Sequence, residues 1–357
     1  MSSSPYLISY DYLSSQHKSY ALFLSTITKP TSYDQAVRDT CWVNVMNAEL
    51  KTLEANKTWQ IVEKPPGVYK IKRKSNGSIE RYKARLVAKG YMQTEGVDFF
   101  DTFSPVAKVT SMQLLLALAS TQNWLVHQLD VNNALLHGEL EEDVYMEVPE
   151  GVNCKEKNKV CKLLKSFYGL KQASRKWYEK LSSLLILLGY KQATIDYSLF
   201  TKSVDHTFTT LLIYVDDIVL VGNSLDEIVY IKSTLDQHFG IKDLGVLNSS
   251  QATHSSKGIS LCQRQYCLDL LVNAGVLGIY EDLAGYRRLI GRLLYLTTTR
   301  PNINYAVQQL SQFHAQPTMM HYQAAQRVFK FLNRSTGKGL FFSRSSSLQL
   351  LGFAYAD

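Results

Sequence analysis

The sequence predicts an α+β fold in which helices and antiparallel strands follow one another in irregular order. Two apolar runs within Phe208–Val221, broken only by Asp216–Asp217, are typical of a β-hairpin. Helical patterns dominate from Leu225 onward, and no regular strand–helix alternation indicates a doubly wound sheet. The 357 residues are 45% hydrophobic and 20% charged, so a disordered or collagen-like chain is excluded and two or three packed units are expected.

The N-terminal part of the chain contains a helix signal and a basic hairpin signal. Residues 1–30 are rich in Ser and Tyr without periodicity, and we expect an extended lead-in there. Thr31–Ser32 can cap a helix, which apolar residues then continue at helical spacing: Trp42, Val45, Met46, Leu50 and Leu53. Between 64 and 90, Ser75-Asn-Gly77 separates two alternating runs, which predicts a β-hairpin with charged faces. This segment holds a single acid, Glu80, against nine bases: Lys64, Lys70, Lys72, Arg73, Lys74, Arg81, Lys83, Arg85 and Lys89.

Further elements are predicted along the rest of the chain. Ser111 can cap a helix that runs through 114–118, and a short apolar strand-like segment from Trp124 ends at Asp130. Residues 176–188 have a helical pattern, as do 286–296 and 321–332. The basic stretch 155–180 interleaves aromatic side chains: Phe167, Tyr168, Trp177 and Tyr178.

Charge and cysteine usage restrict the class of protein. The net charge of +8 makes a polyanionic partner a candidate, although many basic proteins have none. Five cysteines without a C-x-x-C pair indicate neither a disulfide framework nor a zinc ribbon. The start of the chain lacks the pattern of a secretory signal, and no apolar stretch approaches about 18 residues. We therefore expect an intracellular protein that is not secreted and has no membrane partner.

The adjacent carboxylates of Asp216 and Asp217 lie between two segments apolar enough to be buried. At ~4 Å their repulsion is about 1 kcal/mol in water and about 4 kcal/mol at an effective dielectric constant of 20. A fold usually accepts such a pair when a cation offsets it, and Mg²⁺ prefers carboxylate oxygen. An ordinary solvent-exposed Asp-Asp turn is the alternative, and the local sequence leaves both open.

Asp130 favours the metal site because it also ends an apolar strand-like run, before Val131-Asn-Asn-Ala134. Two strands of one sheet that each deliver an Asp to the same edge create a site for two Mg²⁺ ions. Two such ions, ~3.5–4 Å apart, clamp the attacking and the leaving oxygen of phosphoryl transfer.

With these residues in place, the chain resembles the reverse transcriptase of copia-type LTR retrotransposons over roughly residues 31–357. The resemblance rests on ordered strings: Arg81-Tyr-Lys-Ala-Arg-Leu-Val-Ala-Lys-Gly90, Phe100-Asp-Thr-Phe-Ser-Pro-Val-Ala107, Gln128-Leu-Asp-Val-Asn-Asn-Ala134, Ser166-Phe-Tyr-Gly-Leu-Lys-Gln172, Tyr214-Val-Asp-Asp217, Tyr286-Arg-Arg-Leu-Ile-Gly-Arg292 and Thr299-Arg-Pro301. It implies a right-hand polymerase with fingers, a palm with an antiparallel sheet and a helical thumb. It also implies an RNA-directed DNA polymerase that extends a primer 3′-hydroxyl with dNTPs along an RNA or DNA template.

The resemblance also implies roles for individual residues. Asp130 and Asp216, with the Val131 carbonyl, would ligate two Mg²⁺ ions, and Asp217 would be the supporting catalytic carboxylate. Tyr214 would lie under the primer end. A thumb helix would place three residues near the duplex backbone, where contact is independent of sequence: Arg288, Gly291 and Arg292.

The nucleotide site is implied in the same way. Lys83 and Arg85 would approach the incoming triphosphate, with a solvated charged face as the alternative reading. Gly169 to Gln172 would lie near the templating base pair, with a plain loop as the alternative. Leu135 would contact the nucleotide sugar, where the family usually has Phe and the larger ring would exclude a 2′-hydroxyl.

The resemblance predicts boundaries and a setting. We expect an extended lead-in over 1–30, fingers and palm over 31–235, a thumb- or connection-like helical region over 236–345, and a truncated first strand of an RNase H domain over 346–357. Tyr355 stands where that domain has an Asp, so no RNase H activity is expected from this chain. The setting implied is the cytoplasm, within a virus-like particle, or the nucleus.

Two departures from the family leave other functions open. A strand of the fingers is missing after Pro65-Pro-Gly67, and Val246–Gln251 replaces a strand that resembles the primer grip. The first alternative is therefore a degenerate transposon-derived protein that keeps the fold and nucleic-acid binding without polymerase activity. A metal-dependent phosphohydrolase or nuclease using the same Asp cluster is a third reading, although it would need neither the basic hairpin nor the thumb-like helix.

Overall fold

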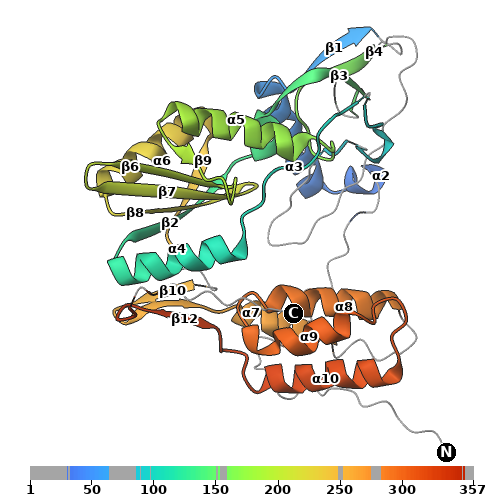
Figure 1. The fold of residues 1–357 in the computed structure, drawn as a ribbon. Coiled ribbons are helices and arrows are strands. Elements are labelled where there is room, and N and C mark those ends of the chain that lie inside the picture. The colour runs from blue at the N-terminus through green and yellow to red at the C-terminus, as the bar shows by residue number, and fades with distance from the viewer. Residues whose placement is uncertain are drawn as a thin grey trace, which may run out of the picture.

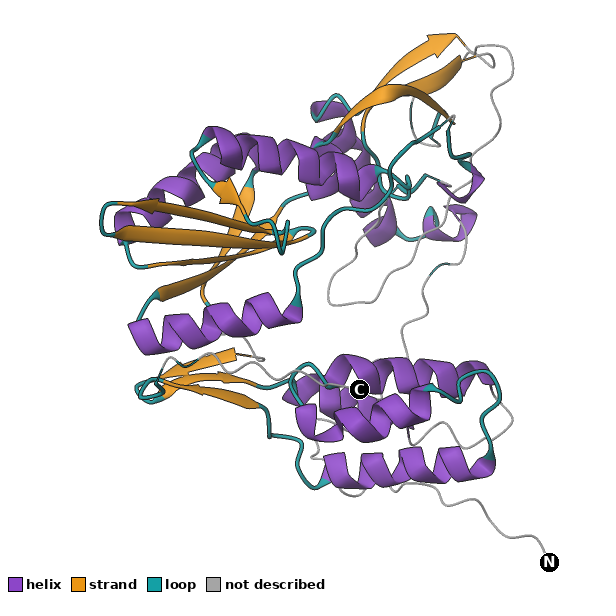
Figure 2. Ribbon diagram, viewed as in Figure 1, coloured by secondary structure: helices purple, strands orange, loops and turns teal. Residues whose placement is uncertain are grey.

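The computed structural model describes residues 30, 33–63, 86–88, 90–96, 98–149, 152, 159–247, 252–274, 283–347 and 349 (Figures 1 and 2). Within these ranges the named strands form three sheets, and all their pairings are antiparallel. Helices and strands alternate irregularly along the chain. The prediction of an α+β fold is confirmed.

A six-stranded sheet is the largest of the three. Its strand order places β2 between β8 and β9, although β9 follows β2 by more than a hundred positions in the sequence. From one edge to the other the strands are β5 (Lys191–Gln192), β6 (Leu199–Val204), β7 (Thr207–Tyr214), β8 (Asp217–Gly222), β2 (Leu125–Val131) and β9 (Ile241–Val246). The predicted hairpin is β7–β8, and the predicted strand that carries Asp130 is β2.

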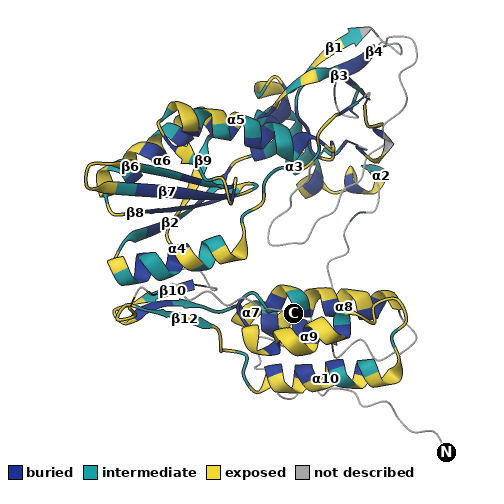
Figure 3. Ribbon diagram, viewed as in Figure 1, coloured by how far each residue is buried: buried dark blue, intermediate teal, exposed yellow. Residues whose placement is uncertain are grey.

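Helices cover both faces of this sheet. Alternate side chains of a strand point to opposite faces, so each strand supplies both cores. Leu129, Ile213 and Ile218 pack with α5 (Ala173–Leu187) and α6 (Leu225–Phe239). Val126, Leu212 and Val219 pack on the other face with α4 (Val109–Gln122). Figure 1 shows α5 and α6 above the sheet and α4 below it, and Figure 3 shows buried residues lining both contacts.

A smaller sheet lies next to the N-terminal helices. It consists of β1 (Trp59–Glu63), β4 (Lys159–Lys165) and β3 (Glu139–Glu147), and the preceding helices are α2 (Tyr33–Ala36) and α3 (Thr40–Ala55). The predicted helix with buried Trp42 and Leu53 is therefore present. Its cap is Asp39, whose carboxylate accepts the Cys41 N–H at 2.9 Å, and the proposed caps Thr31–Ser32 lie outside the described residues. Most of the predicted basic hairpin, 64–85 and residue 89, also lies outside them.

The C-terminal region combines helices with a third sheet, β10 (Ala252–Ser255), β11 (Gly258–Leu261) and β12 (Leu340–Ser343). A hairpin thus follows β9 closely, after residues 248–251, which the structure leaves undescribed. This sheet packs on α4, and the Ser120 hydroxyl donates to the Phe342 carbonyl at 2.7 Å. Between β11 and β12 the described residues form four helices that bury a core of their own: α7 (Arg264–Ala274), α8 (Leu283–Leu296), α9 (Asn304–Ser311) and α10 (Met319–Asn333). The described residues also include short 3₁₀ segments: η2 (Gly90–Met92), η3 (Ala134–His137) and η4 (Pro301–Ile303).

One predicted cap is wrong. The helix expected to begin at Ser111 starts at Val109 with Lys108 as its N-cap. The Ser111 hydroxyl donates instead to the Asp196 carboxylate at 2.5 Å, so a distant partner replaces the local one. In the described residues, no helix is both long and apolar enough for a membrane span.

The predicted boundaries remain predictions. Residue 235 falls inside α6, and β9 beyond it belongs to the six-stranded sheet. The expected RNase H strand lies outside the described residues, apart from 346, 347 and 349.

Candidate catalytic site

Four neighbouring strands bring polar side chains to one end of the six-stranded sheet. The register pairs Tyr214 of β7 with Asp217 of β8, Asp217 with Asp130 of β2, and Asp130 with Lys242 of β9. Residues directly opposite one another in an antiparallel pair point to the same face, with Cβ atoms roughly 4.5–5.5 Å apart. The four side chains therefore form one row across the face that α4 covers further along the strands. Tyr214 is 55% exposed there.

The third predicted carboxylate, Asp216, lies in the turn between β7 and β8. Because Tyr214 and Asp217 are register partners, the turn consists of Val215 and Asp216, and Asp217 is already the first residue of β8. Val215 has φ +57°, whereas Asp216 is not among the residues with positive φ. That sign pattern is the one of a type II′ turn, whose first central position usually holds Gly.

Two hydrogen bonds fix the carbonyls of this turn. The Trp177 indole Nε1–H donates to the Val215 carbonyl at 2.7 Å. The Val131 N–H donates to the Asp216 carbonyl at 2.8 Å, which joins the turn directly to the end of β2. The Asp216 side chain is left on the exposed side of the turn, one residue from Asp217 and beside the strand that carries Asp130.

The carboxylates interact electrostatically. The pKa of Asp217 is raised, first by its partial burial and further by the negative charges of Asp216 and Asp130. A hydrogen bond from Gln128 Nε2, 3.4 Å from Asp217 Oδ1, acts in the opposite direction. A cation at this edge would offset the repulsion among the three carboxylates.

The donor set fits a hard divalent cation such as Mg²⁺, because it consists of carboxylate oxygens with an unrelieved negative charge. It is not a preformed cage. Within the described ranges, no group of three or more His, Cys, Asp or Glu side chains is arranged so that it could hold a metal ion. The sheet therefore brings Asp130, Asp216 and Asp217 to one edge, and ligation by them remains a prediction.

Behind this edge, a partly buried cluster attaches β9 to the sheet. Lys232 of α6 donates to His127 Nδ1 at 2.8 Å and to Asp243 Oδ2 at 2.8 Å, so it links β2 and β9 on the face opposite the carboxylates. The pKa of His127 is lowered, by burial and then by the Lys232 charge, which suits a neutral ring that accepts from lysine. The β2–β9 register shifts between His127 and Leu129, where a bulge gives β9 one residue more than β2, and regular pairing resumes up to Asp130 and Lys242.

The predicted nucleotide residues are placed as follows. Gln172 is buried, and its amide donates to the Asp98 carbonyl at 3.0 Å and accepts from Gln93 Nε2 at 2.9 Å. Gly169 has φ +90°, and a Cβ there would lie 2.1 Å from the Ala88 carbonyl oxygen. The close backbone approach that this glycine permits is thus to the segment 86–88, whose Ala88 N–H donates to the Tyr168 carbonyl at 2.7 Å.

Of the other residues predicted for the nucleotide site, the structure describes Leu135 but not Lys83 or Arg85. Leu135 lies in η3, directly after the strand with Asp130, and is partly buried between two hydrophobic clusters. Lys83 and Arg85 lie outside the described residues. Their approach to a triphosphate stays a prediction.

The predicted duplex-contacting residues lie on α8. Leu289, Ile290 and Leu293 are buried in the C-terminal core, and the opposite side of the helix is exposed. Three predicted residues and two further ones share that exposed side: Arg287, Arg288, Gly291, Arg292 and Tyr295. A Cβ at Gly291 would have no atom within 4 Å, so this part of the surface is open. Gln113 of α4 donates to the Thr298 carbonyl at 3.2 Å, which ties the end of α8 to the palm-like sheet.

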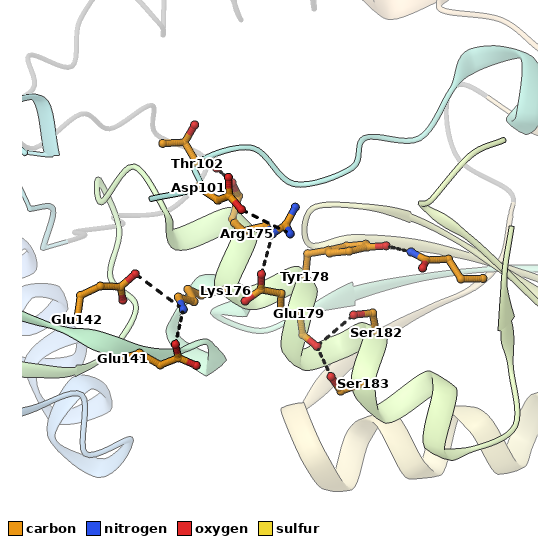
Figure 4. A network of polar contacts seen from close by, with 12 residues as sticks. Asp101, Thr102, Glu141, Glu142, Arg175, Lys176, Tyr178, Glu179, Ser182 and Ser183 are labelled. Carbon is orange, nitrogen blue, oxygen red and sulfur yellow. Dashed lines mark hydrogen bonds and ion pairs between the residues drawn. The ribbon is translucent and has the colours of Figure 1, made fainter. Parts of the chain in front are cut away.

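Helix α5, which carries Trp177, is anchored along its length (Figure 4). Arg175 contacts Glu179 at 2.7 Å and Asp101 at 3.9 Å, and Lys176 lies 3.8 Å from both Glu141 and Glu142 of β3. The hydroxyl of Tyr178 donates to the Tyr197 carbonyl at 2.6 Å. These contacts connect α5 to the segment before α4, to β3 and to the loop before β6.

Sequence reasoning missed two residues of this site, Lys242 and Trp177. Lys242 follows the strand pattern of β9, but only the pairing of β9 with β2 shows that it faces Asp130. Trp177 stands on a helix with an amphipathic pattern, which indicates core packing, and its polar partner is a backbone carbonyl 38 positions away.

A comparison with protein families and curated proteins agrees with this geometry. Residues 56–284 match the family described as reverse transcriptase (RNA-dependent DNA polymerase). The chain is 38% identical to the retrovirus-related Pol polyprotein from transposon RE1 of Arabidopsis thaliana, over 95% of this chain and 25% of that protein. It is 35% identical to the corresponding polyprotein from transposon TNT 1-94 of Nicotiana tabacum, over 88% of this chain and 27% of that protein. The chain thus spans about a quarter of the length of these curated relatives.

Among solved structures, the chain is similar to a foamy viral protease–reverse transcriptase in complex with double-stranded DNA. The TM-score is 0.50 and the sequence identity is 12%, with 83% of this chain and 49% of that chain covered. At this identity the similarity shows the fold alone, and that fold is the one expected from the resemblance to copia-type Pol polyproteins.

Proposed function

The chain belongs to the reverse transcriptase (RNA-dependent DNA polymerase) family, and from that premise we propose that it extends a primer 3′-hydroxyl with deoxynucleoside triphosphates. The template would be RNA or DNA. The reaction is a nucleotidyl transfer at the end of the neighbouring strands β8 and β2, where the three carboxylates lie.

One observation carries this proposal: the register that pairs Asp130 with Asp217 and sets the Asp216 turn beside β2. Reverse transcriptases generally use divalent metal ions, and this edge concentrates three carboxylates. Asp130 and Asp216, with the Val131 carbonyl, would hold two Mg²⁺ ions, and Asp217 would support them. When bound, the ions would favour ionisation of the primer hydroxyl and neutralise the departing pyrophosphate.

The other residues of the row act on the two substrates. Tyr214, exposed next to Asp217, would lie under the primer end and set its height above the carboxylates. Lys242, on the other side of Asp130, supplies a cation close to where charge develops on the phosphoryl group.

Lys83 and Arg85, which are not part of the row, would approach the same triphosphate. Leu135 would contact the sugar, and Gly169 and Gln172 would shape the loop beside it.

The test is primer extension on poly(rA)/oligo(dT) with Mg²⁺, using the wild type, Asp130→Asn and, as a matched control, Asp226→Asn. Asp226 is an exposed carboxylate in the first turn of α6. We expect extension by the wild type and by Asp226→Asn, and a loss on the order of 10²–10³-fold or more for Asp130→Asn.

The second candidate is a degenerate transposon-derived protein that binds nucleic acid without copying it. It is favoured by the two departures from the family in the sequence, after Pro65-Pro-Gly67 and at Val246–Gln251. Duplex binding without extension by the wild type would support this candidate and contradict the polymerase. Cleavage of the duplex or phosphate release without added nucleotides would point to a metal-dependent nuclease or phosphohydrolase.

The exposed side of α8 gives an independent prediction about nucleic-acid binding. We propose that Arg288 and Arg292 contact phosphates of the duplex, with Gly291 allowing close approach. Arg292→Gln should weaken duplex binding equally for different sequences and reduce the slope of log affinity against log salt by about 1. Fluorescence anisotropy at several salt concentrations measures this slope. An unchanged slope would contradict phosphate contact by Arg292.

A further inference from the structure

The turn that presents Asp216 has a backbone conformation that its own sequence does not favour. Val215 has φ +57°, in the left-handed region, where a β-branched residue is a genuine outlier. Gly would adopt this conformation without strain, and Asn or Asp would tolerate it. Residues held in such regions persist only when the surrounding structure determines them, and they gather at functional sites.

The surrounding structure determines this turn mainly through one side chain. Trp177 is 1% exposed, and its Nε1–H donates to the Val215 carbonyl at 2.7 Å. The ring packs edge-on against Phe239, with centroids 4.9 Å apart, and against His137 at 5.7 Å. The indole thus has a fixed orientation on α5, and its donor is aimed at one carbonyl.

We propose that Trp177 is a positioning residue for nucleotidyl transfer: its indole N–H holds the Val215 carbonyl and thereby sets the Asp216 carboxylate beside Asp130. The inference rests on the polymerase function proposed above. The Val131 N–H, which donates to the Asp216 carbonyl at 2.8 Å, fixes the other peptide of the turn. The two bonds together determine the orientation of both peptides that flank Asp216.

Packing alone does not account for an indole at this position. A phenyl ring would fill much of the same space between α5 and α6, but it would leave the carbonyl of the half-buried Val215 without its donor. A peptide free of that bond can rotate toward the conformation that Val prefers, and rotation displaces the next side chain. A displacement of about 1 Å in a reacting centre can lower the rate ~10²-fold.

The experiment compares Trp177→Phe with Trp124→Phe in single-nucleotide incorporation. Trp124 stacks on Phe208 near the other end of the same sheet, with centroids 4.9 Å apart, and serves as the matched control. For Trp177→Phe we expect kcat to fall about 10–100-fold. The KM for dNTP and the Kd for primer–template should change less than about threefold, because the indole touches neither. Trp124→Phe should keep the wild-type kcat.

A rescue variant separates positioning from general destabilisation. In Val215→Gly the left-handed conformation carries no strain, so the turn should need the indole bond less. We expect Val215→Gly to raise Tm with and without Trp177→Phe, but to raise kcat at least about threefold more in the Trp177→Phe background than in the wild type. An equal gain in kcat from Val215→Gly in the two backgrounds, or an equal loss of kcat in Trp124→Phe and Trp177→Phe, would overturn the proposal.

A spectroscopic measurement tests the bond apart from activity. The chain has four Trp residues, so an ¹⁵N-labelled sample shows four indole N–H signals, and the one lost in Trp177→Phe is identified. We expect that signal to exchange with solvent at least about 100-fold more slowly than the signal lost in Trp124→Phe. Fast exchange would contradict the bond. If the bond is protected but the wild type does not extend a primer, the polymerase function fails and the structural half of the inference stands.

Discussion

Two turns of the same sheet, one at each end of β7, reverse the chain within two residues but are stabilised in different ways. Both are two-residue turns between register partners: Val204 and Thr207 enclose Asp205–His206, and Tyr214 and Asp217 enclose Val215–Asp216. Both have a positive φ at the first turn residue, 51° at Asp205 and 57° at Val215. The outer turn uses Asp, which tolerates this region, and the inner turn uses Val, which does not.

The two turns also differ in what stabilises them. The outer turn is exposed and is supported by the Asn223 amide, which donates to the His206 carbonyl at 2.8 Å. The inner turn is held by a buried indole and by the end of a neighbouring strand. The outer turn thus relies on local residue preference, whereas the inner turn, which carries Asp216, is held by tertiary contacts.

The largest expected effect concerns the acid of each turn. Asp216→Asn should lower primer extension on the order of 10²–10³-fold, because it removes a charge from the proposed metal site. Asp205→Asn makes the same substitution in the outer turn and should leave the rate unchanged. Steady-state incorporation rates at saturating primer–template measure both. Equal losses in the two variants would show that the inner turn has no special role.

A smaller effect is expected from replacing the strained residue. Val215→Gly should raise the free energy of unfolding by about 1 kcal/mol, since relief of the left-handed strain exceeds the entropy that Gly adds to the unfolded chain. Asp205→Gly should stay within about 0.5 kcal/mol of the wild type. Urea denaturation of both variants measures the difference. A Val215→Gly protein less stable than Asp205→Gly would contradict the assignment of strain to the inner turn.

The smallest effect concerns pH. The folded-state pKa of Asp217 is raised, so the folded chain binds this proton more tightly than the unfolded chain, and the resulting destabilisation grows as pH rises above 3.8. Without added metal, Asp217→Asn should therefore raise Tm at pH 7, by about 1–3 °C after allowance for solvent screening. The gain should disappear as pH falls toward 3.8. Scanning calorimetry at both pH values tests this, and a gain that grows on acidification would refute it.

The sequence predicts local elements well where one apolar pattern dominates. The apolar residues of β7 and β8 form two short continuous runs, and the stripe of Leu289, Ile290 and Leu293 repeats at helical spacing, so the hairpin and the helix were predictable. Which residues of the hairpin lie in the turn and which in the strands was harder to predict. Two adjacent acids suggest that both lie in the turn, but pairing with Asp130 and Tyr214 draws Asp217 into β8 and leaves Val215 in the turn.

What could not be predicted depends on partners distant in the sequence. The row Tyr214–Asp217–Asp130–Lys242 requires the order of four strands, and nothing local to β9 selects β2 as its neighbour. The nucleotide role of Gln172 stays a prediction, and the sequence did not indicate that its amide is engaged by Gln93 and the Asp98 carbonyl. Ser111 is a further example of a distant partner. Its hydroxyl donates to the Asp196 carboxylate and does not cap the helix in which it lies.

The third sheet has a consequence for how the molecule can be rebuilt. Leu261 of β11 and Leu340 of β12 are register partners, so the chain departs for α7 and returns from α10 at a single place. The four helices are thus an insertion between two paired strands. They have a hydrophobic core of their own, and the two ends of the insertion lie next to each other. Such a segment is exchangeable: a short linker across Leu261 and Leu340 would delete it, and the corresponding helices of another member of the family could be grafted there while the carboxylate edge stays intact.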